Sequence, residues 1–162
     1  ELKKNSKIYY DQEGLGSRSF KKDVYDIYQR ASFSLIQENL KESGDKLAAA
    51  KAFEDFYKEF EETASTEVLS TAVNNAAVYY SNEGRVADAM RLRHLLIEDE
   101  KFGDKTKYYY DAIENLGFAY ESIADFDQAA KYYEMLYTLF PDQLEKVEDD
   151  DDKKAALIDK AI

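Results

Sequence analysis

The chain repeats itself at an interval of 40 residues, and this periodicity limits its fold more than any other feature. Small residues recur at this spacing between helical segments: Gly44, Gly84 and Ala124. A second series follows each of these positions by five residues: Ala49, Ala89 and Ala129. A short repeat of this kind buries its apolar face only by stacking on its neighbours. The sequence therefore predicts a stack of similar units.

Each unit is predicted to be a helical hairpin, and residues 110–141 are its clearest copy. Two helical stripes lie in this copy: Ile113, Leu116, Gly117 and Tyr120 in the first half, then Ala129, Tyr133, Leu136 and Phe140. Between them, Asp125 and Gln128 have the spacing of a helix N-cap, and Asp45 is likewise predicted to cap the helix that follows Gly44. Pro141 is predicted to end the second helix, because it has no N–H group and clashes with the preceding turn. Small residues at Gly117 and Ala129 predict a close approach of the two helices.

These residues resemble one repeat of the tetratricopeptide repeat (TPR) family. Two positions depart from that pattern, with Ile113 in place of a large aromatic residue and Ala124 in place of a glycine. The period of 40 residues exceeds the roughly 34 of most TPRs and approaches the HEAT and armadillo range, which stays an alternative. The six additional residues fit longer helices or longer connections. The resemblance implies an all-α fold, a right-handed superhelical solenoid of antiparallel hairpins.

The repeats divide residues 1–162, taken as one domain, into successive parts. We expect a partial upstream helix over 1–19, repeats over 20–62, 65–103 and 104–141, and a capping helix or partial fourth repeat over 144–162. The acidic residues 149–152 suit the start of that last helix, where the helix dipole stabilises negative charge. With the lysine that follows, they also have the form of an enterokinase recognition sequence.

Charge and composition exclude several functions. The formal net charge is −12 and the pI is near 4.6, which argues against nucleic-acid binding. No run of about 18 apolar residues predicts insertion into a membrane. The chain has no cysteine, so disulfides and thiolate sites are excluded, while cytoplasm and periplasm both remain compatible.

The sequence gives no constellation of catalytic or metal-binding residues, so we expect neither an enzyme nor a cofactor. His94 is the only histidine, and with no cysteine beside it we expect it to face solvent or to pack at a rim. Arg93 stands where the neighbouring repeats have Phe53 and Tyr133, which predicts a local weakening of that apolar stripe. Of the three consecutive tyrosines at 108–110, at least one should be exposed or contact a neighbouring repeat.

The TPR resemblance implies a concave groove lined by the first helix of each hairpin. Asn75 and Asn115 match the position at which peptide-binding TPR proteins often place an asparagine, although Leu35 interrupts this series in the first repeat. An asparagine amide can pair with both the C=O and the N–H of an extended backbone. The acidic residues nearby favour a basic or polar peptide. The predicted peptide-binding residues are Asn75, Asn115, Asn74, Glu38, Asp111, Glu114, Phe118 and Glu121.

Two other interpretations stay open at this point. The asparagines are equally compatible with a purely structural role on the helix surface. The chain can also be a structural spacer or self-assembly element of a longer repeat protein, as a homo-oligomer or as a continuation of a longer array. Ser34, Glu38 and Asp111 occupy positions where a chaperone-tail receptor of the TPR family would need Lys, Asn and Lys, which argues against that function.

Overall fold

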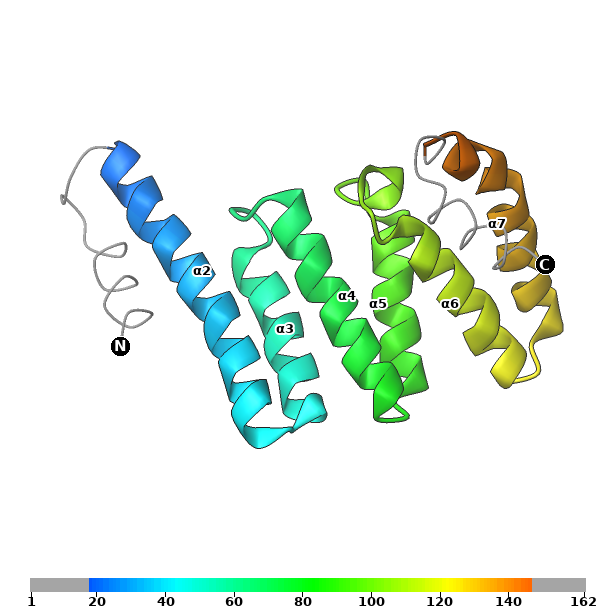
Figure 1. Cartoon of the computed structure of the whole chain (residues 1–162), viewed down its shortest axis with the longest axis horizontal. Coiled ribbons are helices and arrows are strands. Elements are labelled where there is room, and N and C mark those ends of the chain that lie inside the picture. Colours follow the sequence, from blue (N-terminus) through cyan, green and yellow to red (C-terminus); the bar gives the residue numbers. More distant parts are fainter. Residues whose placement is uncertain (1–17, 147–162) are drawn as a thin grey trace.

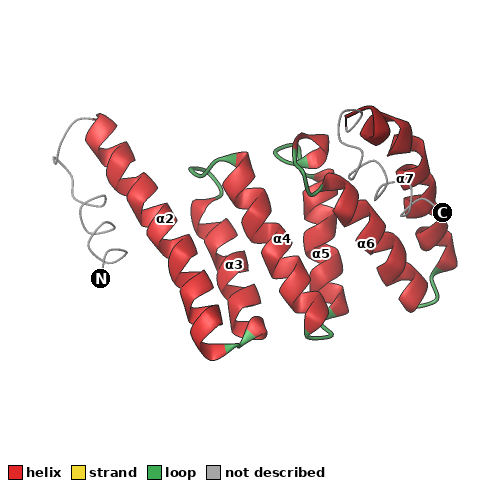
Figure 2. Ribbon diagram, in the orientation of Figure 1, coloured by secondary structure: helices red, strands yellow, loops and turns green. Residues whose placement is uncertain are grey.

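The computed structural model describes residues 18–146 and has an all-α fold. Within this range the chain forms helices and short connections, with no strand (Figure 2). The predicted segments 1–19 and 144–162 lie almost entirely outside the described residues, and so does the acidic run 149–152. Six α-helices and one short 3-10 helix make up the described part: α2 (Arg18–Ser43), α3 (Lys46–Phe60), α4 (Thr66–Asn82), α5 (Val86–Glu98), η1 (Gly103–Lys105), α6 (Tyr109–Ser122) and α7 (Phe126–Lys146).

The helices stand in a row in chain order, and each runs in the opposite direction to the one before it (Figure 1). In the described part, the backbones of consecutive α-helices pack together and those of no other pair of α-helices do, although single side chains reach further, from α3 to α5 and from α5 to α7. Thus α4 and α6 both pack against α5, but their backbones do not meet. The fold is therefore built from contacts between consecutive helices.

The three turns inside the hairpins have the same backbone conformation. Gly44, Gly84 and Ala124 have φ values of 68°, 69° and 60°, in the left-handed region. The backbone N–H of Arg85 donates to the carbonyl of Tyr80 at 2.8 Å, and that of Asp125 donates to the carbonyl of Tyr120 at 2.9 Å. These bonds close the ends of α4 and α6 in the manner of a Schellman motif. The 40-residue period of the sequence thus recurs in the backbone geometry.

Helix starts follow the predicted capping residues. The Asp45 carboxylate accepts a 2.9 Å hydrogen bond from the N–H of Ala48 at the start of α3. Asp125 accepts one of 3.3 Å from the N–H of Gln128 at the start of α7. Both side chains satisfy amides that have no partner within their helices, so both predicted N-caps are confirmed.

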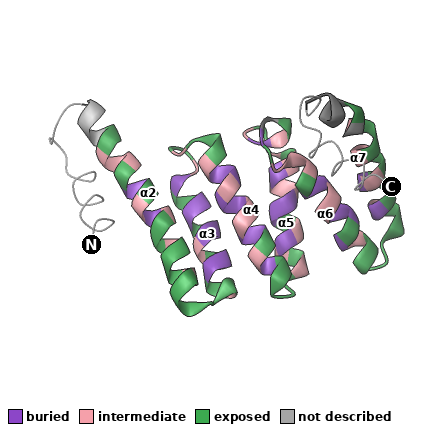
Figure 3. Cartoon of the chain, in the orientation of Figure 1, coloured by how far each residue is buried: buried purple, intermediate pink, exposed green. Residues whose placement is uncertain are grey.

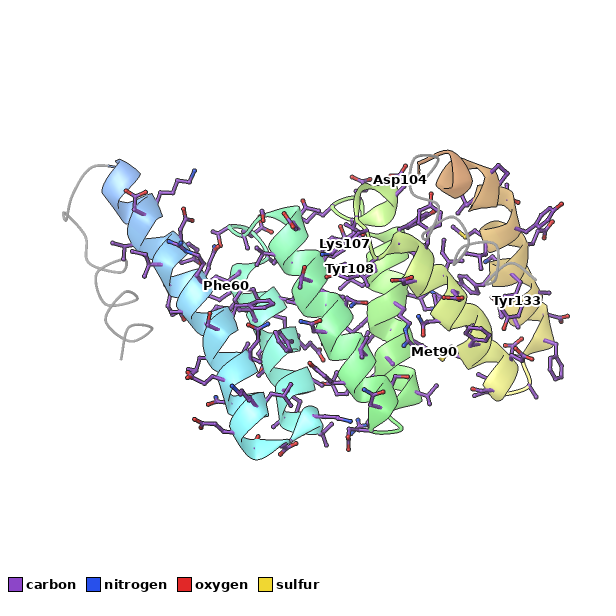
Figure 4. The ribbon with its side chains drawn as sticks, viewed as in Figure 1. Phe60, Met90, Asp104, Lys107, Tyr108 and Tyr133 are labelled. Carbon is purple, nitrogen blue, oxygen red and sulfur yellow. The ribbon has the colours of Figure 1, made fainter. Side chains whose placement is uncertain are left out.

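Gly117 allows α6 and α7 to approach closely, as predicted. A Cβ atom at this position would lie 2.5 Å from the ring of Tyr133 on α7. Figure 4 shows the Tyr133 side chain between the two helices. The small residue therefore makes room for an aromatic ring from the second helix of the hairpin.

The core consists of aromatic and aliphatic side chains that lie between consecutive helices. Figure 3 shows buried residues along α3 and α5, whereas the C-terminal half of α2 is mostly exposed. One cluster spans α2 to α6 and includes Phe53, Phe60 and Leu92. Phe102, in the connection before α6, is fully buried in the same cluster and its ring lies 6.0 Å from that of Tyr57. A second cluster, around Ile113 and two other buried residues, joins α6 to α7.

The prediction that Pro141 ends the last helix is wrong. Helix α7 continues through Pro141 to Lys146. A proline inside a helix leaves the carbonyl four residues earlier without its partner, here that of Tyr137. Pro141 is exposed and Tyr137 is 81 % exposed, so water can hydrate that carbonyl. Exposure thus lowers the free-energy cost of the unpaired Tyr137 carbonyl, which would otherwise break the helix.

Candidate functional site

The eight predicted peptide-binding residues lie on the first helices of the three hairpins. Four of them are exposed: Glu38 on α2, and Asp111, Phe118 and Glu121 on α6. Four are half-buried: Asn74 and Asn75 on α4, and Glu114 and Asn115 on α6. The backbones of α2, α4 and α6 do not meet, and the predicted residues are distributed over these three helices.

The two asparagines at equivalent positions differ in their hydrogen bonding. The side-chain amide of Asn115 donates a 2.6 Å hydrogen bond to the carbonyl of Asp111, one turn earlier on α6. Asn75 makes no side-chain hydrogen bond to any residue in the described range. Asn115 therefore keeps its carbonyl oxygen and one N–H for other partners, and Asn75 keeps the whole amide.

Apolar side chains are exposed beside these polar groups. Val78 on α4 is 40 % exposed, and its equivalent Phe118 on α6 is 55 % exposed. The Phe118 ring lies 6.0 Å from the ring of Tyr133 in an edge-to-face arrangement. An exposed valine and phenylalanine on neighbouring first helices give this side of the molecule apolar surface as well as amides and carboxylates.

Glu121 has a role that the sequence did not indicate. It accepts a 2.6 Å hydrogen bond from the hydroxyl of Tyr133, which fastens the exposed end of α6 to α7. Burial and this contact with Glu121 raise the pKa of Tyr133 to about 12. One of the predicted acidic residues is thus already engaged within the hairpin.

Arg93 is buried, where the sequence predicted only a weak point in the apolar stripe. It is 7 % exposed and lies on the same face of α5 as Ala89, Leu92 and Leu96. Burial lowers the pKa of its guanidinium. The one sequence signal for this feature is the position itself, since the other two repeats place the aromatic residues Phe53 and Tyr133 there.

A second buried charged residue, Glu54 on α3, has several partners. Its carboxylate accepts hydrogen bonds from the Tyr80 hydroxyl at 3.1 Å and from Arg91 at 3.0 Å, and it pairs with Lys58 at 2.8 Å. Burial alone would raise the pKa of Glu54, but these three partners together hold it below its usual value. Burial, followed by the bond to Glu54, raises the pKa of Tyr80 to about 12. This cluster joins α3, α4 and α5.

His94 occupies the equivalent position one repeat later and is packed, as predicted for a rim residue. Its Nε2 lies 3.0 Å from the Tyr120 hydroxyl, and its Nδ1 lies 2.9 Å from Glu98 and 3.3 Å from the Tyr132 hydroxyl. The rings of Tyr120 and Tyr132 are stacked, with centroids 5.5 Å apart, and His94 meets both edge-to-face. The histidine therefore joins α5 to both helices of the next hairpin.

The prediction for residues 108–110 is confirmed by Tyr108. Its hydroxyl donates a 3.2 Å hydrogen bond to Thr71 on α4, in the preceding hairpin, and Lys107 lies over its ring at 5.0 Å from the centroid.

Metal binding and membrane insertion each require a feature that the described part of the chain lacks. No group of three or more His, Cys, Asp or Glu side chains is arranged to hold a metal ion. None of the helices described is at once long and apolar enough to cross a membrane.

Comparisons of the chain with protein-family models, with curated proteins and with solved structures gave no match. A function can therefore be inferred only from the residues and contacts described above.

Proposed function

We propose that the hairpins form a right-handed, TPR-like superhelical solenoid. The support comes from the 40-residue repeat, the left-handed residue in each hairpin turn, and backbone packing between consecutive helices. In such a stack the first helices, α2, α4 and α6, line the concave side. The predicted peptide-binding residues would then face one groove.

On this basis we propose that the protein is a non-catalytic interaction module that binds an extended peptide across α2, α4 and α6. The observation that carries the proposal is the half-buried amide of Asn75, which has no hydrogen-bond partner in the described part of the chain and lies one turn from the exposed Val78. A free amide beside apolar surface can fix the backbone of an extended segment while its side chains rest on the apolar patch.

The charge of this side indicates the kind of peptide. Glu38 contributes a carboxylate from α2, and Asp111 and Glu114 contribute two from α6. Complementary charge speeds the encounter of two partners and selects between them. A basic or polar segment is therefore the expected ligand.

A second function, that of a spacer or self-assembly element, is favoured by a different observation. Besides Phe118, the last hairpin exposes three further large apolar side chains: Ile123, Phe126 and Tyr137. Apolar surface at the end of a repeat stack is where a further repeat or another copy would pack. Light scattering over a range of concentrations tests this, because self-assembly gives a mass above 18.7 kDa that rises with concentration.

Binding of short lysine-rich peptides, selected from a random display library, tests the groove. Replacing both Asn75 and Asn115 by Ala should weaken the selected peptide about tenfold or more, because each lost amide hydrogen bond is worth about 1 kcal/mol. Asn82→Ala, on the exposed end of α4, is the matched control and should leave the affinity unchanged. If the Asn75 and Asn115 variant folds normally and binds as tightly as the original chain, the groove proposal is wrong.

A further inference from the structure

Arg93 combines deep burial with the absence of any counter-charge. It belongs to the buried face of α5, between Leu92 and Leu96 in the helical pattern, and only 7 % of its surface is exposed. Among the residues that the structure describes, no oxygen accepts a hydrogen bond from its guanidinium and no carboxylate pairs with it. A buried cation without a partner is costly, so this arrangement needs an explanation.

The chain supplies carboxylates to the other arginines nearby. Arg91, which is half-exposed, pairs with Glu54 at 3.0 Å, and Arg85 pairs with Asp88 at 2.6 Å. These exposed cations would be well hydrated without a partner. The buried arginine is therefore the one whose guanidinium remains available.

The guanidinium of Arg93 also remains accessible from outside. No side-chain nitrogen in the described range is both sealed from solvent and without a hydrogen-bond partner. Because Arg93 has no partner, each of its guanidinium nitrogens must reach solvent. The small exposed fraction therefore belongs at least partly to the charged end, while the aliphatic stem is covered.

The repeat places this charged end beside the proposed groove. In the third hairpin, Tyr133 of α7 lies against Gly117 and Phe118 of α6. Applied 40 residues earlier in the chain, the same register predicts that Arg93 of α5 lies opposite Ala77 and Val78 of α4. Ala77 is buried and Val78 is partly exposed. In this register the Arg93 side chain extends from the core toward the side of α4 that carries Asn74 and Asn75.

We propose that Arg93 is a binding site for a carboxylate group of the bound partner. Arginine suits this task because its planar N–H groups can pair with both oxygens of a carboxylate at once. The inference rests on the proposed function, and it adds a specific requirement to the ligand. The peptide would carry one Asp or Glu side chain at Arg93, with basic or polar residues on either side facing Glu38 of α2 and Asp111 and Glu114 of α6.

An acetate titration tests Arg93 without the peptide. In ¹⁵N–¹H spectra of the arginine Nε–Hε groups, sodium acetate should shift the Arg93 signal in a saturable way, with a midpoint in the millimolar range. Sodium chloride at the same ionic strength should not shift it, and the Arg85 signal should stay in place because Asp88 already occupies that guanidinium. The proposal is overturned if the Arg93 signal does not shift with acetate, or if chloride shifts it equally.

Two substitutions separate binding from stability. Arg93→Met keeps an unbranched apolar stem, and Arg93→Tyr copies the residue of the third repeat. Both should raise the thermal midpoint in the absence of acetate, by about 2–4 °C, and both should abolish the further rise that acetate gives to the original chain. A fall in the midpoint for both variants, with the acetate effect retained, would assign Arg93 a purely structural role.

The peptide experiment then distinguishes this proposal from the groove proposal. A selected peptide that contains one Glu should lose about tenfold or more in affinity when that Glu becomes Gln, and the loss should disappear in the Arg93→Met variant. If acetate binds Arg93 but the Asn75 and Asn115 variant binds peptide normally, the groove proposal fails and the carboxylate site stands. If the Asn75 and Asn115 variant loses affinity but replacing the peptide's Glu by Gln has no effect, the carboxylate-site proposal is wrong and the groove proposal stands.

Discussion

The hydroxyl of Tyr80 donates a 3.1 Å hydrogen bond to the carboxylate of Glu54, and this bond ties the first hairpin to the second. One repeat later, the hydroxyl of Tyr120 lies 3.0 Å from Nε2 of His94, so the same two positions meet again. A residue four positions further along the same helix, Lys58 or Glu98, contacts the central group in each case. The two junctions therefore share their geometry and differ in the central group, which is a carboxylate in the first and an imidazole in the second.

Replacing Glu54 by Ala should destabilise the fold by about 2–4 kcal/mol, because a buried network would lose its acceptor. The Tyr80 hydroxyl and Arg91 would be left without it. Urea unfolding followed by circular dichroism measures the change. Asp55→Ala, on the exposed side of the same helix, is the control and should change stability by less than about 0.5 kcal/mol.

Stability should fall at alkaline pH because of the buried tyrosines. The pKa of Tyr80 is about 12 in the folded chain, against an ordinary value of 10.0. A raised pKa means that the fold favours the neutral phenol. The stabilisation that neutral Tyr80 gives to the fold is fully present below pH 10 and is lost as the pH rises toward 12. The loss from Tyr80 amounts to about 2–3 kcal/mol.

Tyr80→Phe is the control for this pH effect. The variant lacks the hydroxyl and should be about 1 kcal/mol less stable at neutral pH. It cannot ionise at this position, so its stability should decline less between pH 10 and 12. Parallel decline of the two proteins in urea titrations over this range would contradict the assignment to Tyr80.

Ala124→Gly should stabilise the protein by about 1 kcal/mol. Ala124 has φ 60°, a conformation that costs an L-residue roughly 1–2 kcal/mol and costs glycine little. Gly84→Ala is the reciprocal change, and it should destabilise by a similar amount through strain alone, since nothing lies within 4 Å of the added Cβ. Thermal unfolding of the two variants should therefore show midpoints that move in opposite directions.

Gly117→Val should destabilise the last hairpin by about 1–3 kcal/mol, because the branched side chain must displace the ring of Tyr133. Adding Tyr133→Ala should remove most of this penalty, although Tyr133→Ala is itself destabilising. A double-mutant cycle in urea isolates the interaction. Strictly additive effects of the two substitutions would show that the ring does not limit the size of residue 117.

The helical hairpins could be predicted because their signals are local. Glycines at the turns, acidic caps and the 3.6-residue stripes each act within a few residues, and α3 begins directly after the predicted cap, Asp45. The prediction that Pro141 ends α7 was wrong because the relevant signal is not local. Its effect on α7 depends on exposure to solvent, which is a property of the folded chain.

The polar contacts between hairpins were not predicted, because they join residues far apart in sequence. The Tyr80 to Glu54 bond spans 26 residues, and no local pattern marks it. The repeat itself contained the missing information, since Tyr80 and Tyr120 share one 40-residue series and Glu54 and His94 share another. The repeat does not reveal that the Arg93 guanidinium lacks a carboxylate partner, because this depends on how far the fold places each carboxylate from it.

Backbone packing between consecutive helices also determines how the molecule would respond to force. A load applied at the two ends would pass through the helix contacts in series, so the weakest junction would open first while the others held. The chain would then lengthen stepwise, one hairpin at a time, and could refold in the same order when the load was released.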